Sequence, residues 1–244
     1  MSDHWEHYFV TIEEQPGSIV LDMEIWDELD RNRYRFPVCL EIEMQHREEN
    51  GFPNSEEADW MNELEDRITQ ELTQSACYVG RFTVEGVRSL YLYFNSPTIP
   101  KETVDKHLTP AGYAFRILEI EEAEPWDFYF EFLYPNEYEF QHIGNRSVIE
   151  SLQNAGDSLE EPRRVDHWIV FEERADMLGF AGKAEELGFG IEGQQREEGE
   201  FHLHIHRKDY VDFRSINAVT DIFVSLAEEY RFRYDGWETQ AIKS

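Results

Sequence analysis

The chain has 244 residues, which is enough for two domains of about 100–150 residues each. Hydrophobic residues make up 41% and aromatic residues 14%, so packed cores are expected and a disordered chain is not. Asp and Glu number 52 against 22 Lys and Arg, a formal net charge of −30, which argues against direct binding of nucleic acid or anionic membranes. We expect instead a basic protein partner, although a merely soluble or salt-adapted surface fits the same charge.

The first half of the chain begins with a predicted hairpin. Trp5–Ile12 and Ser18–Ile25 are its strands, and the Gln-Pro-Gly-Ser run at 15–18 is expected to make the turn. Pro37–His46 alternates apolar and acidic residues, which predicts a strand with one wet face. Asn54, with Glu57 three residues later, predicts a capping box at the start of a helix. The apolar stripe of that helix is Trp60, Met61, Leu64, Ile68 and Leu72.

The rest of this half continues as short strands and one helix. A second hairpin is expected across Glu85-Gly86, followed by a helix over Lys101–Leu108 and a strand over Tyr113–Ile120. Trp126–Tyr134 reads as an aromatic strand with Phe128, Phe130 and Phe132 on one face. We therefore predict an α+β domain with a mainly antiparallel sheet and helices on one side.

The regular pattern lapses between residues 135 and 144, and we place the domain boundary there. The predicted domains cover residues 1–140 and 144–244. The second begins with a short helix capped by Asn145 or Ser147 and ended by Gly156 at the C′ position.

The body of the second domain has the order βαββαβ. Its predicted elements are a strand at Val165–Phe171, a helix to Leu187, two short strands around Phe201–His206, a helix at Arg214–Glu229 and a closing strand from Tyr230. Residues 192–200 are expected to be an exposed hairpin loop. This order is the split βαβ or ferredoxin-like arrangement, so the whole chain is predicted to be α+β with mainly antiparallel sheets.

The segment Leu226–Thr239, with its Tyr-Asp-Gly-Trp core, resembles the C-terminal signature of the regulator of ribonuclease E activity B family (RraB). Ala184–Ile191 and the helix Val148–Gly156 support the resemblance. It implies a small, acidic, ferredoxin-like domain without enzyme activity that binds the scaffold region of ribonuclease E and inhibits RNA turnover. Such a region is basic and partly disordered, which suits an acidic surface.

The first half resembles a domain of unknown function, number 695. The features that carry the resemblance are Tyr78-Val-Gly-Arg81, the strand Arg88–Phe94 and the stretch Trp126–Pro135. This family brings no known chemistry.

The candidate partner-binding residues are Tyr234, Asp235, Trp237 and Glu238, as an amphipathic recognition patch. The alternative is that Asp235 and Gly236 form a bend that ends the last strand and tucks Trp237 onto the core.

His202, His204 and His206 alternate along one strand and share a face, about 7 Å apart at each step. Leu203 and Ile205 are expected to face the helices, and His167 joins the histidines if the strand register allows it. The row could be an exposed or interface sheet face, a zinc site, or an interface that responds to protonation near pH ~6. We expect no metal here, partly because no carboxylate or Cys is placed to complete a metal shell, and we expect no cofactor.

No dinucleotide, phosphate-loop, serine-hydrolase or zinc-protease motif is present, and Cys39 and Cys77 read as buried hydrophobic residues. There is also no apolar run of about 18 residues and no leader-like start. We therefore expect a non-enzymatic, cytoplasmic bacterial regulator that binds a basic segment of a ribonuclease or RNA-processing factor. The alternatives are a self-associating interaction module, with the histidine face as its dimer surface, and an unrecognised enzyme with a site between the domains.

Overall fold

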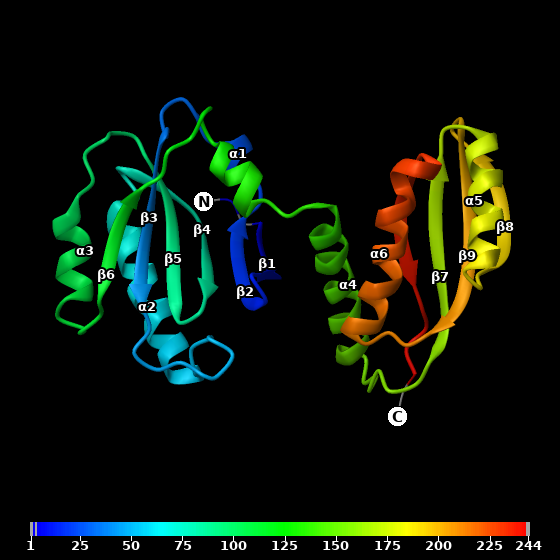
Figure 1. Cartoon of the computed structure of the whole chain (residues 1–244), viewed down its shortest axis with the longest axis horizontal. Helices are drawn as coiled ribbons and strands as arrows, with labels where there is room; N and C mark the ends of the chain where they lie inside the picture. The colour runs from blue at the N-terminus through cyan, green and yellow to red at the C-terminus, as the bar shows by residue number, and fades with distance from the viewer. Residues whose placement is uncertain (1, 3, 243–244) are drawn as a thin grey trace. The chain divides into compact units, whose positions relative to one another are not determined.

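The structure, a computed structural model, describes residue 2 and residues 4–242. It divides into two compact units, Met1–Pro135 (unit 1) and Asn136–Ser244 (unit 2). Each unit combines helices with an antiparallel sheet, so the α+β prediction is confirmed (Figure 1). None of the helices in the described ranges is long and apolar enough to cross a membrane.

Unit 1 is built on one sheet of six strands within the described residues, ordered β1-β2-β4-β5-β3-β6. The strands are β1 (Trp5–Ile12), β2 (Gln15–Asp22), β3 (Phe36–Glu43), β4 (Ala76–Val84), β5 (Val87–Phe94) and β6 (Phe115–Glu119). Its helices are α1 (Ile25–Glu28), α2 (Ser55–Leu72), α3 (Lys101–Leu108) and the π-helical turn η1 (Tyr129–Leu133). Every strand pair is antiparallel, and the predicted hairpin across Glu85-Gly86 is present.

The first hairpin forms, but its predicted turn is wrong. Glu13 and Glu14 make the connection, both with positive φ (50° and 70°), and Ile12 pairs with Gln15. Two-residue loops with positive φ match the twist of the flanking strands, so the turn is tighter than the Pro-Gly signal indicated. Gly17 lies inside β2 for a different reason: a Cβ there would lie 2.5 Å from the Phe82 ring.

Helix α2 covers one face of this sheet. Asn54 caps it by accepting from the backbone N–H of Glu57 at 2.9 Å. The Glu57 carboxylate accepts from the backbone N–H of Gln45 at 2.9 Å, which is a different role from the capping box expected of it. Trp60, assigned to the apolar stripe, is 43% exposed, while the rest of the stripe is buried against β3, β4 and β5.

The segment Trp126–Tyr134 is not a strand, which corrects the sequence prediction. Its buried positions are Trp126, Tyr129 and Leu133, and this spacing is helical. These side chains lie against the face of the sheet that α2 does not cover: the indole of Trp126 stacks on Tyr93 with 4.3 Å between ring centroids. Unit 1 therefore has a covering layer on both faces of its sheet, whereas helices were expected on one.

Unit 2 opens with a long helix, α4 (Glu137–Asn154), which runs through most of the stretch of residues 135–144 where no regular element was expected. Asn136 caps it, with Glu139 completing a capping box. The short helix predicted to start at Asn145 or Ser147 is therefore the second half of a longer one. Gly156 follows it with φ of +90°, in the C′ role predicted from the sequence.

The rest of unit 2 runs strand, helix, strand, strand, helix, strand. The elements are β7 (Arg163–Phe171), α5 (Arg174–Glu186), β8 (Gly190–Glu197), β9 (Glu200–Asp209), α6 (Phe213–Tyr230) and β10 (Phe232–Glu238). The four strands of this described stretch form an antiparallel sheet ordered β10-β7-β9-β8. Residues 192–200, expected to be a loop, mostly extend β8 and β9, with a tight turn at Glu198-Gly199.

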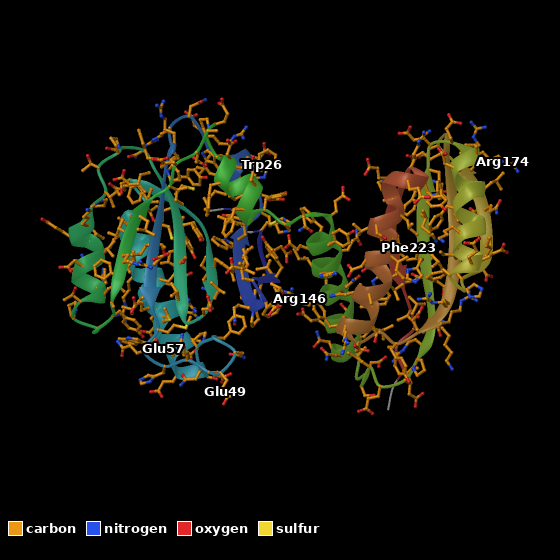
Figure 2. All side chains as sticks on the ribbon, in the orientation of Figure 1. Trp26, Glu49, Glu57, Arg146, Arg174 and Phe223 are labelled. Atoms are coloured by element: carbon orange, nitrogen blue, oxygen red, sulfur yellow. The ribbon has the colours of Figure 1, made fainter. Side chains whose placement is uncertain are left out.

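One core fills the space between this sheet and the helices α4, α5 and α6. Phe223 of α6 is fully buried there (Figure 2). Its ring lies edge-on to that of Phe180 from α5, with 6.3 Å between the ring centroids. From the sheet, Val165, Ile169, Leu203 and Ile205 point to the same core and are inaccessible to solvent. All three helices pack on this side, so the opposite side of the sheet is left to polar side chains.

Candidate functional site

The candidate site is this opposite side, which we call the open sheet face. It carries Arg164, Asp166, Trp168, Glu192, His202, His204, His206, Arg233 and Glu238. Because side chains alternate along a strand, burial of Leu203 and Ile205 in the core sends the three histidines of β9 to the open sheet face, as expected from the sequence. Gly190 pairs with His206, and a Cβ there would lie 2.8 Å from the imidazole.

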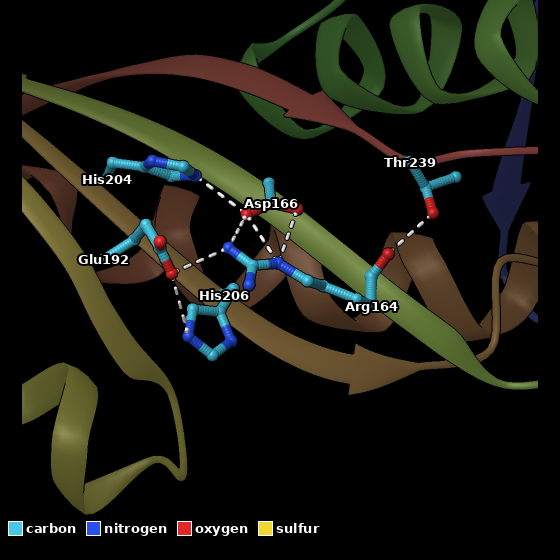
Figure 3. A network of polar contacts seen from close by, with 6 residues as sticks. All are labelled: Arg164, Asp166, Glu192, His204, His206 and Thr239. Atoms are coloured by element: carbon cyan, nitrogen blue, oxygen red, sulfur yellow. Dashed lines mark hydrogen bonds and ion pairs between the residues drawn. The ribbon is translucent and has the colours of Figure 1, made fainter.

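Arg164 is at the centre of a polar network on this face (Figure 3). Its Nε donates to both carboxylate oxygens of Asp166 at 2.9 and 3.0 Å, and its Nη2 donates to Glu192 Oε2 at 2.9 Å. These charge-assisted bonds hold the pKa values of Asp166 and Glu192 below their usual range. A single guanidinium thus ties the central strand β7 to the edge strand β8.

Two histidines extend the network. His204 Nε2 lies 2.8 Å from Asp166 Oδ1, and its ring stacks on Trp168 with 4.7 Å between centroids and 14° between planes. His206 Nε2 lies 3.5 Å from Glu192 Oε2. Each carboxylate therefore already serves one imidazole and the shared guanidinium.

The expectation that no carboxylate is placed beside the histidines is wrong, since Asp166 lies beside His204 and Glu192 beside His206. The arrangement nevertheless does not resemble a metal centre. In the described part of the chain, no group of three or more His, Cys, Asp or Glu side chains could hold a metal ion. The guanidinium of Arg164 stands between the two carboxylates, where it would repel a cation.

His167 does not join the histidine row. The register pairs it with Ile205, so it points into the core, where it is fully buried. Its Nδ1 lies 2.8 Å from the hydroxyl of Tyr234, and burial lowers its pKa to about 3. The possibility raised from the sequence, that it adds to the cluster, is therefore wrong.

The four predicted partner-binding residues do not form one surface. A β-bulge at Asp235 shifts the alternation of β10, so Trp237 points to the same side as Tyr234, toward the core. The hydroxyl of Tyr234 meets His167, and its ring stacks on Phe223 at 4.8 Å. Asp235 and Glu238 are exposed, and Glu238 pairs across the sheet with Asp166.

Asn145 of α4 is the partner of Trp237 and was missed in the sequence. It is 1% exposed; its Oδ1 accepts from Trp237 Nε1 at 2.7 Å, and its Nδ2 donates to Asn217 and Thr220 of α6, each at 2.8 Å. An Asn on the buried face of a helix was the available signal, but the residue had been assigned to a cap. The network on β7 was also missed, although Arg164 and Asp166 sit at the i, i+2 spacing that shares a strand face.

Unit 1 has its own buried polar cluster, around Glu65 of α2. Its Oε1 accepts from the Tyr78 hydroxyl at 2.7 Å and from Arg81 at 2.9 Å, and its Oε2 accepts from Arg88 at 3.2 Å. Burial and the adjacent carboxylate raise the pKa of Tyr78 well above its ordinary value. Two guanidinium groups and a phenol pair with this carboxylate, so the cluster ties α2 to the sheet.

Comparisons with solved structures and curated proteins add little. A putative glycine cleavage system transcriptional repressor matches at 7% identity and a TM-score of 0.25, covering 84% of this chain and 98% of that one. An unknown protein from Galdieria sulphuraria matches at 7% identity and a TM-score of 0.23, covering 82% and 96%. These likenesses are too weak to establish a shared fold. No curated protein matches the chain.

Family models match both units. The model of a family of unknown function, DUF695, covers residues 3–134, which is more than half of the chain. The model described as regulator of ribonuclease activity B covers residues 142–239, which is nearly all of unit 2. Both resemblances stated from the sequence are therefore confirmed. The chain belongs to the DUF695 family, and its second unit matches the RraB family of ribonuclease regulators.

Proposed function

We propose that this chain is a non-catalytic regulator whose unit 2 binds a basic segment of a ribonuclease, such as ribonuclease E, or of an associated RNA-processing factor, and modulates its activity. The observation that carries the proposal is the RraB match across residues 142–239. Such a partner would place the protein in the bacterial cytoplasm.

We propose a ferredoxin-like fold for the body of unit 2. The order β7-α5-β8-β9-α6-β10 and the sheet order β10-β7-β9-β8 support this assignment. Helix α4 is an addition before that body, held to α6 by the side chain of Asn145.

We further propose that the partner meets the open sheet face and the exposed end of β10. Asp166 and Glu192 share the one guanidinium of Arg164, so a single negative charge is left over on carboxylates that are already held in place, without the entropy cost of ordering free side chains. Asp235 and Glu238 add two exposed carboxylates at the neighbouring strand, and Asp235 accepts from Arg233 at 2.6 Å. Tyr234 and Trp237 act indirectly, because they hold β10 in place from the core side.

The charge of the chain supports a cationic partner over RNA itself. At a formal net charge of −30, electrostatic steering favours basic segments and opposes phosphate backbones. The affinity for the partner should therefore fall as salt rises, and RNA should not compete for the same surface.

The test is calorimetric titration of the full chain with the basic scaffold segment of a ribonuclease E-type enzyme, at low and high salt, alongside the rate of RNA cleavage. We expect salt-sensitive binding and a changed cleavage rate. The variant Asp235→Lys/Glu238→Lys should bind about tenfold or more weakly. The control Glu49→Lys/Asp59→Lys makes the same charge change on exposed positions of unit 1 and should bind like the natural chain.

The outcomes separate the surface from the function. Equal binding by both variants would discard the β10 surface while keeping the regulator. Absence of binding to any basic ribonuclease segment at low salt would discard the regulator.

A further inference from the structure

The edge of the sheet in unit 1 carries features that the proposed function does not use. Strand β6 is the last strand of that sheet and, among the residues that the structure describes, pairs with β3 alone (Figure 1). Ala114 accepts from the N–H of Glu43, and Ile120 donates to Pro37, so these residues direct their backbone groups inward. In an antiparallel ladder this direction alternates, which turns the N–H and C=O groups of Phe115, Ile117 and Glu119 away from β3.

A groove of ≈ 430 Å³ lies on the helix side of this edge. Its floor is Phe115 and Ile117, and α3 contributes Lys101, Glu102 and Asp105 to its wall. Because alternate residues share a face, Glu119 continues the row of Phe115 and Ile117. At that end a second hollow of ≈ 600 Å³ is lined by Glu119, Glu121 and Glu124 among others.

The charges around the groove and the second hollow indicate which kind of protein segment would bind there. The groove wall has two carboxylates against one ammonium, and the second hollow has four glutamates against Arg35. Arg116, which would repel a basic chain, is occupied on the other face of the strand by an ion pair with Glu41 at 2.6 Å. The groove beside β6 therefore has an apolar floor and a mainly acidic rim.

We propose that β6 and α3 form a binding site for an extended protein segment that carries apolar and basic side chains on the same face of its strand. The segment adds to the sheet as a further strand, bonding to the outward backbone groups of Phe115, Ile117 and Glu119. On the face toward α3, its apolar side chains rest on Phe115 and Ile117, and basic side chains of that same face reach Glu102, Asp105 and Glu119. This site lies in unit 1 and is independent of the surface proposed for unit 2.

The probe is a fluorescein-labelled octapeptide in which every second residue is threonine and the positions between them carry valine and lysine or arginine, so that apolar and basic side chains share one strand face; it is titrated into the full chain and followed by fluorescence anisotropy. Two versions carry N-methyl groups on one or the other alternate set of amides, and a third replaces the basic residues with glutamate. We expect binding by the parent peptide and loss of at least tenfold in affinity for one N-methylated version and for the acidic version. Amide exchange should slow at Phe115, Ile117 and Glu119.

Two variants locate the site on the protein. Ile117→Pro removes one outward donor without removing a bond to β3, and should weaken binding at least tenfold, whereas Ile117→Val should not. Glu102→Lys/Asp105→Lys should also weaken binding, against a control, Glu185→Lys/Glu229→Lys, that reverses two exposed charges in unit 2. Thermal unfolding verifies that each variant is folded.

The proposal is overturned if both N-methylated peptides bind like the parent, or if slowed amides map elsewhere. It is also overturned if β6 amides are protected without peptide in a dimer that Ile117→Pro dissociates, because the occupant is then a second copy of the chain.

Discussion

The indole N–H of Trp237 donates to Oδ1 of Asn145 at 2.7 Å, across 92 residues of sequence. This bond joins the last strand of unit 2 to its first helix. Asn145 also donates to Asn217 and Thr220, so one buried amide connects α4, α6 and β10. Trp237 therefore has a core role, and any effect of its substitution on partner binding must first be corrected for stability.

Asn145→Ala should destabilise unit 2 by more than a surface substitution, because it leaves the buried indole N–H without an acceptor. We expect a loss of about 1–3 kcal/mol in the free energy of unfolding. Trp237→Phe should cost a similar amount, and the double variant should cost less than the sum, since both remove the same bond. Urea unfolding followed by circular dichroism measures all three. Strict additivity would show that the two side chains act separately.

The buried pair of Asp157 and Arg163 should be the most sensitive ion pair in unit 2. Arg163 Nη2 donates to Asp157 Oδ1 at 2.9 Å, and backbone N–H groups of Leu159 and Ile242 donate to the same carboxylate at 2.8 and 2.7 Å. Asp157→Asn leaves a buried guanidinium uncompensated, at a cost of about 3–5 kcal/mol. The exposed Arg164 offers a control: Arg164→Gln should destabilise the chain much less, because solvent screens its ion pair with Asp166.

The ion pair of Asp157 and Arg163 should make the stability of the fold depend on pH in the acidic range. Bonding to Arg163 holds the pKa of Asp157 well below its ordinary value of 3.8. A carboxyl with a depressed pKa stabilises the fold fully above the unfolded value and loses that contribution as pH falls below it. Unfolding of Asp157→Asn should therefore vary less with pH in this acidic range than unfolding of the natural chain.

His167 should remain neutral at pH values where an ordinary imidazole is protonated. Burial lowers its pKa from 6.5 to about 3. As pH falls, the unfolded chain binds a proton at this histidine before the folded chain does. The free energy of unfolding is therefore at its full value above pH 6.5 and decreases as pH falls toward 3. An NMR titration should show no shift of the His167 ring signals between pH ~7 and ~5. A midpoint near 6.5 would mean that the imidazole is accessible to solvent.

Cys39 and Cys77 should react slowly in the folded chain. Both are buried and free, and burial raises their pKa values to about 11 and about 12. Since the thiolate is the reactive form, labelling by a disulfide reagent near pH ~8 should be on the order of 100-fold slower than in denaturant. The Cys77→Ser variant would report the rate of Cys39 alone. Rapid labelling of the native chain would indicate frequent opening of unit 1.

Local sequence patterns were sufficient to predict most of the helices and strands. The alternation of Val38, Leu40 and Ile42 correctly predicted the face of β3 that packs against α2, and the cap at Asn54 marked the start of α2. The predicted wet face is wrong, because Cys39 on that face is buried as well. The β9 histidines were placed correctly because Leu203 and Ile205 fix the phase of that strand. These signals work because period and capping are properties of neighbouring residues.

The sequence predictions failed where contacts between residues far apart in the chain determine the local structure. Phe128, Phe130 and Phe132 alternate like a strand, yet Tyr93 and the sheet behind it select the helical face of Trp126, Tyr129 and Leu133. The phase of β10 likewise depends on a single bulge at Asp235, which no alternation count reveals. One residue of shift decides whether Trp237 faces solvent or the core, and therefore whether it reads as a recognition residue or a structural one.

The hydroxyl of Tyr8 bonds to the carbonyl of Leu133, which joins the first strand of unit 1 to its last turn. During synthesis, this closure waits until almost all of unit 1 has left the ribosome. Until then the aromatic face of the sheet lacks its cover, and a nascent chain stalled after β6 would expose Tyr93 and its neighbours to chaperones.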